Sequence, residues 1–137
     1  MGRAQAVALA VAALAIALVC AGCNGKAALK PSGCVRVFFF GRGSGTTTPA
    51  QIAAVRRRLE SFRDKLISYE FVSRREALAR MRRRYPAFVL RMPYNPLPAS
   101  FEATPGSVDY ANELVEALTP HPPGVHAVRY ARRRRRC

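Results

Sequence analysis

Tryptophan is absent from the sequence, and acidic residues are scarce: eight Asp and Glu stand against 23 Lys and Arg, so the formal net charge is +15. A chain of 137 residues is also too short for a multi-span transporter, and it leaves room for one domain or two small lobes. Hydrophobic residues nevertheless make up 50% of the chain. This content excludes a disordered basic tail and predicts a folded domain.

Residues that would support catalysis or cofactor binding are also lacking. The sequence contains no Ser/His/Asp or Cys/His set that stands out, and the glycine-rich segment 41–45 lacks the GK[ST] ending of a phosphate-binding loop. The two histidines, His121 and His126, have no Cys, Asp or Glu at metal-ligand spacing. We therefore predict a protein that is not an enzyme and that holds no cofactor and no metal.

The N-terminal segment has the pattern of a secretory signal peptide over residues 1–22. A single positive charge at Arg3 precedes an apolar run over residues 4–19, and small residues follow at Ala21 and Gly22. A transmembrane helix is the alternative, but this run is shorter than the ~20 residues that a spanning helix needs. We therefore expect the protein to be exported.

The end of this signal predicts a lipid anchor on Cys23. Residues 20–23 (Cys-Ala-Gly-Cys) resemble the lipobox of bacterial lipoproteins, which are diacylated on a cysteine and cleaved before it. Several acyl chains on one residue suffice for stable anchoring. We expect the mature protein at the extracytoplasmic face of the cell membrane, on a polar tether over residues 23–34. Ordinary cleavage and release as a secreted protein is the alternative.

Residues 35–98 contain the first half of a folded domain. Segments 35–40 and 66–72 are rich in β-branched and aromatic residues, which predicts two strands. A capping box at residues 48–51 opens a helix between them, and a second capping box at residues 73–76 opens a helix that ends at Pro86. An apolar loop with three prolines follows over residues 87–98. The expected inward stripe of the first helix is Ile52, Val55, Leu59 and Phe62. That of the second helix is Ala77, Leu78, Met81 and Tyr85.

The second half repeats the strand-helix-strand pattern. Strands are predicted over residues 99–103 and 125–130, and residues 104–107 form a turn that caps the helix between them. Two split βαβ units with antiparallel pairing make an α+β fold, a ferredoxin-like sandwich, over residues 35–130, with a small inserted lobe at about 74–98. The inward residues of the last helix are Ala111, Leu114, Val115 and Leu118.

The ends of this domain predict a disulfide. The first and last strands of such a sheet are antiparallel neighbours, so the basic tail, residues 131–137, can fold back to bring Cys137 to Cys34. These two cysteines also remain as an even pair once Cys20 is cleaved off and Cys23 is lipidated. A Cys137 that is frayed, unpaired or bonded to a second chain is the alternative. The same geometry places five cations near the membrane: Arg132, Arg133, Arg134, Arg135 and Arg136.

Five segments of the domain resemble the extracellular domain of FtsX, a permease-like bacterial cell-division protein. They are residues 35–40, 48–52, 69–78, 95–101 and 124–130, and segment 95–101 (Asn-Pro-Leu-Pro-Ala-Ser-Phe) is the most specific. The resemblance implies a non-enzymatic receptor domain outside the membrane that docks or activates peptidoglycan hydrolases. Here we expect the domain as a stand-alone, lipoprotein-like chain without the four membrane spans of FtsX.

An apolar segment of the inserted lobe is the candidate partner-binding site. Methionine and aromatic side chains held by prolines, on a lobe that projects from a rigid sheet, are typical of a surface that accepts a partner's helix. The resemblance to FtsX also implies that a hydrolase docks at this lobe. The alternative is that the segment only covers the second helix. The candidate residues are Phe88, Val89, Leu90, Met92, Tyr94 and Leu97.

Three arginine runs, at residues 56–58, 82–84 and 132–136, leave a second function open. They could contact anionic lipids or wall polymers, which would make the protein a basic envelope adaptor. Nucleic acid is not expected, because export removes the protein from it and segment 35–40 lacks the aromatic motif of RNA-binding sheets. Our leading prediction is a cell-division protein of the envelope that binds, and could regulate, a peptidoglycan hydrolase.

Overall fold

The computed structural model describes residues 29–41, 46–132 and 137, so the expected signal peptide and Cys23 lie outside the described residues. Four strands form one antiparallel sheet: β1 (Cys34–Phe39), β2 (Leu66–Val72), β3 (Ser100–Pro105) and β4 (Val125–Ala131). Their order across the sheet is β2-β3-β1-β4, so each βαβ half contributes one central and one edge strand. This interleaved arrangement confirms the predicted ferredoxin-like α+β fold.

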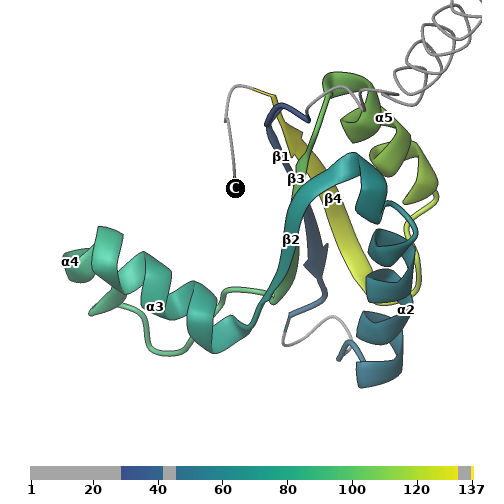
Figure 1. Cartoon of the computed structure of the whole chain (residues 1–137). Coiled ribbons are helices and arrows are strands. Elements are labelled where there is room, and N and C mark those ends of the chain that lie inside the picture. Colours follow the sequence, from purple (N-terminus) through teal and green to yellow (C-terminus); the bar gives the residue numbers. More distant parts are fainter. Residues whose placement is uncertain (1–28, 42–45, 133–136) are drawn as a thin grey trace, which may run out of the picture.

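Two helices, α2 (Pro49–Glu60) and α5 (Val108–Ala117), lie against one face of the sheet (Figure 1). Helix α2 begins at the predicted capping box, in which Thr48 Oγ1 accepts a hydrogen bond from the Gln51 amide and the Gln51 side chain accepts one from the Thr48 amide. Ser107 caps α5 by accepting a hydrogen bond from the backbone amide three residues later, at 3.1 Å. These caps satisfy amides that a helix leaves without partners. A 3-10 helix, η1 (Arg63–Lys65), leads into β2.

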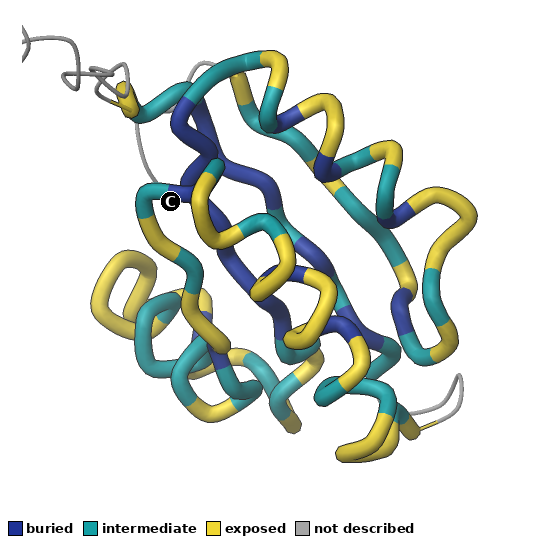
Figure 2. Tube along the Cα trace, turned by 45° about the vertical axis from the view of Figure 1, so that its right-hand side comes forward, coloured by how far each residue is buried: buried dark blue, intermediate teal, exposed yellow. Residues whose placement is uncertain are grey.

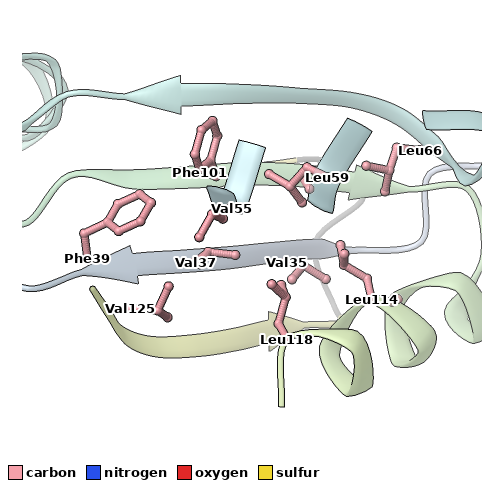
Figure 3. Close-up of a cluster of buried hydrophobic side chains, with 12 residues drawn as sticks. Val35, Val37, Phe39, Val55, Leu59, Leu66, Phe101, Leu114, Leu118 and Val125 are labelled. Atoms are coloured by element: carbon pink, nitrogen blue, oxygen red, sulfur yellow. The ribbon is translucent and has the colours of Figure 1, made fainter. Parts of the chain in front are cut away.

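The hydrophobic core lies between the sheet and these two helices (Figure 2, Figure 3). The alternation of side chains along β1 explains why the core forms on this face of the sheet. Val35, Val37 and Phe39 are buried in the core, whereas Arg36 and Phe38 lie on the other face. All the inward residues predicted for α2 and α5 belong to the core or pack against it. Each fully buried Leu or Phe contributes roughly 1.5–3 kcal/mol, so this layer holds the sheet together.

Helices α3 (Arg74–Arg84) and α4 (Pro86–Val89) form the inserted lobe, which projects from the side of the sheet that α2 and α5 leave open (Figure 1). Ser73 caps α3 as predicted, because its hydroxyl accepts a hydrogen bond from the Glu76 amide at 3.1 Å. The Glu76 carboxylate does not complete the capping box, because it accepts a hydrogen bond from Arg80 instead.

The stripe predicted for the second helix is not buried in the core. Helix α3 contains no buried residue, and Tyr85, at the end of the stripe, is 54% exposed. The physical reason is that α3 stands away from the core of the sheet, so a single helical neighbour and a few loop residues cover its apolar side. The other three members of the stripe are half-buried: Ala77, Leu78 and Met81.

Two segments also differ from the expectation by more than one residue. Residues 87–98 are not a loop throughout, because Pro86 occupies the first position of α4, where the missing N–H of a proline leaves no helical hydrogen bond unmade. Strand β3 runs on to Pro105 instead of ending at residue 103, because residues 104–105 still pair with β2. The turn expected over residues 104–107 is therefore shorter, and only its end caps α5.

The last part of the expected tether docks on the domain. Lys30 and Ser32 donate backbone hydrogen bonds to the carbonyls of residues 105–106, each at 3.1 Å. Tyr130 holds the same segment by donating its hydroxyl to the Ser32 carbonyl at 2.6 Å. Gly33 turns the chain into β1 with a φ of +112°, and a Cβ there would lie 2.6 Å from the Tyr130 ring. The described part of the segment before β1 is thus attached to the sheet.

Candidate functional site

The inserted lobe carries an exposed apolar surface. Tyr85, Phe88, Leu90 and Tyr94 are 54%, 59%, 87% and 63% exposed, and we call these four residues the tip surface. Elsewhere in the described residues two large hydrophobic side chains are exposed, and neither exceeds 38%. Exposed apolar area of this kind, gathered on one projecting element, marks an interaction site more often than scattered single residues do.

The structure divides the six candidate partner-binding residues. Phe88, Leu90 and Tyr94 are exposed. Val89 is buried, and Met92 and Leu97 are half-buried. For residues 88–90, helix α4 and its C-cap explain the division, because successive residues of a helix are rotated by about 100°. Phe88 and Leu90 therefore face solvent, whereas Val89, 7% exposed, points into the lobe. The segment thus combines buried and exposed side chains, and its role in partner binding stays a prediction.

A set of hydrogen bonds, which we call the base brace, closes the lobe where it leaves the sheet. The Arg74 guanidinium donates to the carbonyl of Leu97 at 3.1 Å and to that of Asn95 at 2.6 Å. Asn95 returns the contact, because its Nδ2 donates to the Arg74 carbonyl at 2.8 Å. Its Oδ1 accepts from the Leu97 amide at 3.0 Å. These bonds explain why the Asn-Pro-Leu-Pro segment adopts a fixed path from the lobe into β3.

A cleft of about 370 Å³ lies between the lobe and the open face of the sheet. Arg36, Phe38 and Glu102 line it on the strands, and Met81 and Tyr85 line it on the lobe. Its walls therefore combine apolar side chains with charged ones. Because this space separates α3 from the sheet, the lobe contacts the rest of the domain at few points.

Arg80 is the main polar contact across this space. Its guanidinium lies 3.0 Å from Glu70, 3.0 Å from Glu76 and 3.2 Å from Glu102. The hydrogen bond from Arg80 lowers the pKa of Glu76 below the ordinary value of 4.5, and the same bond raises the pKa of Arg80. Sequence analysis missed this group, although the spacing of Glu76 and Arg80, four residues apart on a helix, is the usual signal of an ion pair.

Cations border the tip surface. Arg82, Arg83 and Arg84 occupy the last turn of α3 and are exposed, and Arg91 is exposed just after α4. The guanidinium of Arg84 lies 6.0 Å from the centre of the Tyr85 ring. This outer limit of cation-π range places one positive charge beside the apolar surface.

The end of the chain lies against the open face of the sheet. Cys34 and Cys137 form a disulfide with their Cα atoms 4.8 Å apart, and the Cys137 amide lies 3.4 Å from Thr104 Oγ1 of β3. Cys137 also borders the cleft below the lobe. Of the basic tail, Arg132 is exposed, and residues 133–136 lie outside the described residues.

Two other kinds of feature are absent from the part of the chain that the structure describes. Within residues 29–41, 46–132 and 137, no three or more His, Cys, Asp or Glu side chains gather where they could hold a metal ion. In the same part of the chain, no helix is both long enough and apolar enough to cross a membrane.

A comparison with models of protein families matches residues 34–134 to the FtsX extracellular domain. The chain belongs to this family. The match spans all four strands, both core helices and the inserted lobe. Membership makes this a cell-division-related extracellular domain, of a family that is non-catalytic and associated with the membrane. A search of the curated proteins finds no match.

Proposed function

We propose that this FtsX-family chain is a lipid-anchored, non-enzymatic protein of the cell envelope that binds a peptidoglycan hydrolase, and could regulate it. The tip surface is the binding site in this proposal. The observation that carries it is the exposure of four large apolar side chains on a lobe that projects from the sheet (Figure 1).

The composition of the tip surface suits a protein partner. Two tyrosines and a phenylalanine bring large side chains with few rotatable bonds, and such residues dominate the energy of protein interfaces. Leu90, the most exposed of the four, offers an aliphatic anchor for a groove between a partner's helices. The exposed arginines beside the surface would form the polar rim that such interfaces have.

The proposed anchor keeps this surface near the membrane. Because Lys30 and Ser32 are attached to the sheet, a lipidated Cys23 would be joined to the domain by about seven residues, which reach at most ~25 Å. The tip surface would then meet partners in the layer between the membrane and the wall. Intact mass of the mature protein tests the anchor: an unmodified N-terminus at a residue other than Cys23 would contradict it.

Affinity capture from envelope extract tests the docking. The exported protein is compared with a Phe88→Ala/Tyr94→Ala variant, and a Leu29→Ala variant serves as control because Leu29 is an exposed apolar residue outside the lobe. We expect the wild type and the control to retain a peptidoglycan hydrolase and the double variant to recover at least tenfold less, as loss of interface anchors does. Equal recovery by all three proteins would overturn the proposal.

The exposed arginines at the end of α3 favour one other function, a basic adaptor for anionic lipids or wall polymers. The two functions differ in their response to salt. Raising the ionic strength from 0.1 M to 1 M shortens the Debye length from about 10 Å to about 3 Å, which should abolish binding through exposed arginines. Hydrolase capture through the tip surface should persist at the higher salt concentration.

A further inference from the structure

We propose that Arg80 is a clamp that holds the inserted lobe at one orientation to the sheet and thereby presents the tip surface. The clamp is an inference from the ion pairs alone. Its effect on partner binding rests on the proposed function. Without the clamp, we infer, the lobe swings about the two chain segments that join it to the sheet.

The geometry of the guanidinium carries the inference. Each of its three nitrogens faces a different carboxylate: Nη2 lies 3.0 Å from Glu70 on β2, Nε lies 3.0 Å from Glu76 on α3, and Nη1 lies 3.2 Å from Glu102 on β3. One side chain thus ties α3 to two neighbouring strands. The planar fork of arginine spreads such contacts over three nitrogens at fixed angles, whereas the three N–H donors of a lysine all lie on one nitrogen.

The two strand carboxylates need a cation between them. Glu70 and Glu102 are directly opposite each other in the pairing of β2 with β3, and like charges in that position destabilise a sheet. Arg36, opposite Glu102 on β1, lies 2.8 Å from its Oε1, and Arg80 contacts its Oε2. Glu70 has its ion pair with Arg80. The sheet therefore attracts Arg80, and the lobe with it, through a charge pattern of its own.

Little else fixes the angle of the lobe. The core cluster described between the sheet, α2 and α5 includes no residue of α3 or α4, and the cleft separates α3 from the strands. The base brace secures the helix at Arg74, the residue where α3 begins. Arg80 lies six residues further along, about 9 Å at 1.5 Å per residue. A second attachment at that distance from the first fixes a rotation that the brace alone leaves free.

Distance measurement between two spin labels tests the clamp. Labels on ketone-bearing amino acids, introduced at Arg91 in the lobe and Asn112 on α5, avoid the cysteines, and both positions are exposed. In the exported protein we expect a narrow distance distribution. Arg80→Gln should broaden it at least twofold, and Arg80→Lys should broaden it by an intermediate amount. Arg83→Gln is the matched control, because Arg83 lies on the same helix, 3.7 Å from Glu76, and touches neither strand carboxylate.

The outcomes separate the clamp from a general loss of structure. Amide exchange of α3 in each variant shows whether the helix is intact. A distribution that broadens in Arg80→Gln while α3 keeps its protection supports the clamp. An unchanged width in Arg80→Gln, or equal broadening in Arg83→Gln, overturns it. If α3 is unfolded in Arg80→Gln, the test uses Arg80→Lys, which keeps the charge. An unchanged width of the distance distribution in Arg80→Lys, or equal broadening in Arg83→Gln, then overturns the clamp.

The clamp and the proposed function can fail separately. A wild type that captures no hydrolase overturns the proposed function, while the label distances still decide the clamp. If both hold, Arg80→Gln should lower hydrolase recovery several-fold and Arg83→Gln should not. This loss would occur with the tip surface itself unaltered, because Arg80 is not one of its four residues.

Discussion

Two adjacent residues of the lobe should respond in opposite ways to the same substitution. Val89 is 7% exposed and Leu90 is 87% exposed, and both are replaced by alanine. Val89→Ala removes two buried methyl-sized groups at about 0.8 kcal/mol each, and the cavity left behind brings the loss to about 2 kcal/mol. Leu90→Ala removes side-chain atoms that are already in water, so the change in lobe stability should stay within about 0.5 kcal/mol.

Amide hydrogen exchange of residues 74–92 measures this difference, because it reports local opening of the lobe even when the sheet remains folded. A loss of about 2 kcal/mol corresponds to roughly 30-fold faster exchange in Val89→Ala, while Leu90→Ala should match the wild type. In hydrolase capture, Leu90→Ala should recover less hydrolase than the wild type, although its amide exchange is normal. Equal acceleration in both variants would refute the division of the segment into buried and exposed residues.

Three further outcomes follow from the described contacts. Replacing Cys34 and Cys137 by alanine opens a cross-link between residues 103 positions apart and should lower the free energy of unfolding by up to ~4.7 kcal/mol, measured by urea denaturation. Gly124→Ala places a side chain at a φ of +86° and should cost about 1–2 kcal/mol in the same assay, and no loss would contradict the described turn. The pKa of Glu76 is lowered in the fold by its hydrogen bond from Arg80, so its contribution to stability is present above pH 4.5 and is lost as the pH falls below it. Denaturation midpoints at pH 7 and pH 3.5 should therefore differ less in Glu76→Gln than in the wild type.

Local signals in the sequence were sufficient for the sheet and its core layer. The Thr48 capping box, the alternation around Val37 and the apolar face that includes Leu114 each depend on residues a few positions apart. Such short-range patterns determine where strands and helices begin and which side they bury. The ferredoxin-like topology then followed from the order of the elements, with short connections and antiparallel pairing.

The lobe was harder to predict, for a physical reason. Its apolar residues at helical spacing are the same whether α3 packs into a core or projects from it, so the pattern did not show that Tyr85 is exposed. Arg80 was missed because two of its three partners, Glu70 and Glu102, come from other elements and are brought to it only by the fold. A proline at the first position of a helix could have revealed α4, since Pro86 marks a start as well as an end.

Photo-crosslinking in living cells tests the central claim most directly. A photoreactive amino acid replaces Leu90 on the tip surface in one variant and Asn112, exposed on α5, in a control. The account predicts a covalent adduct with a peptidoglycan hydrolase from position 90 and none from position 112. Adducts of the same yield from both positions, or adducts at position 90 that contain no hydrolase, would contradict docking through the lobe.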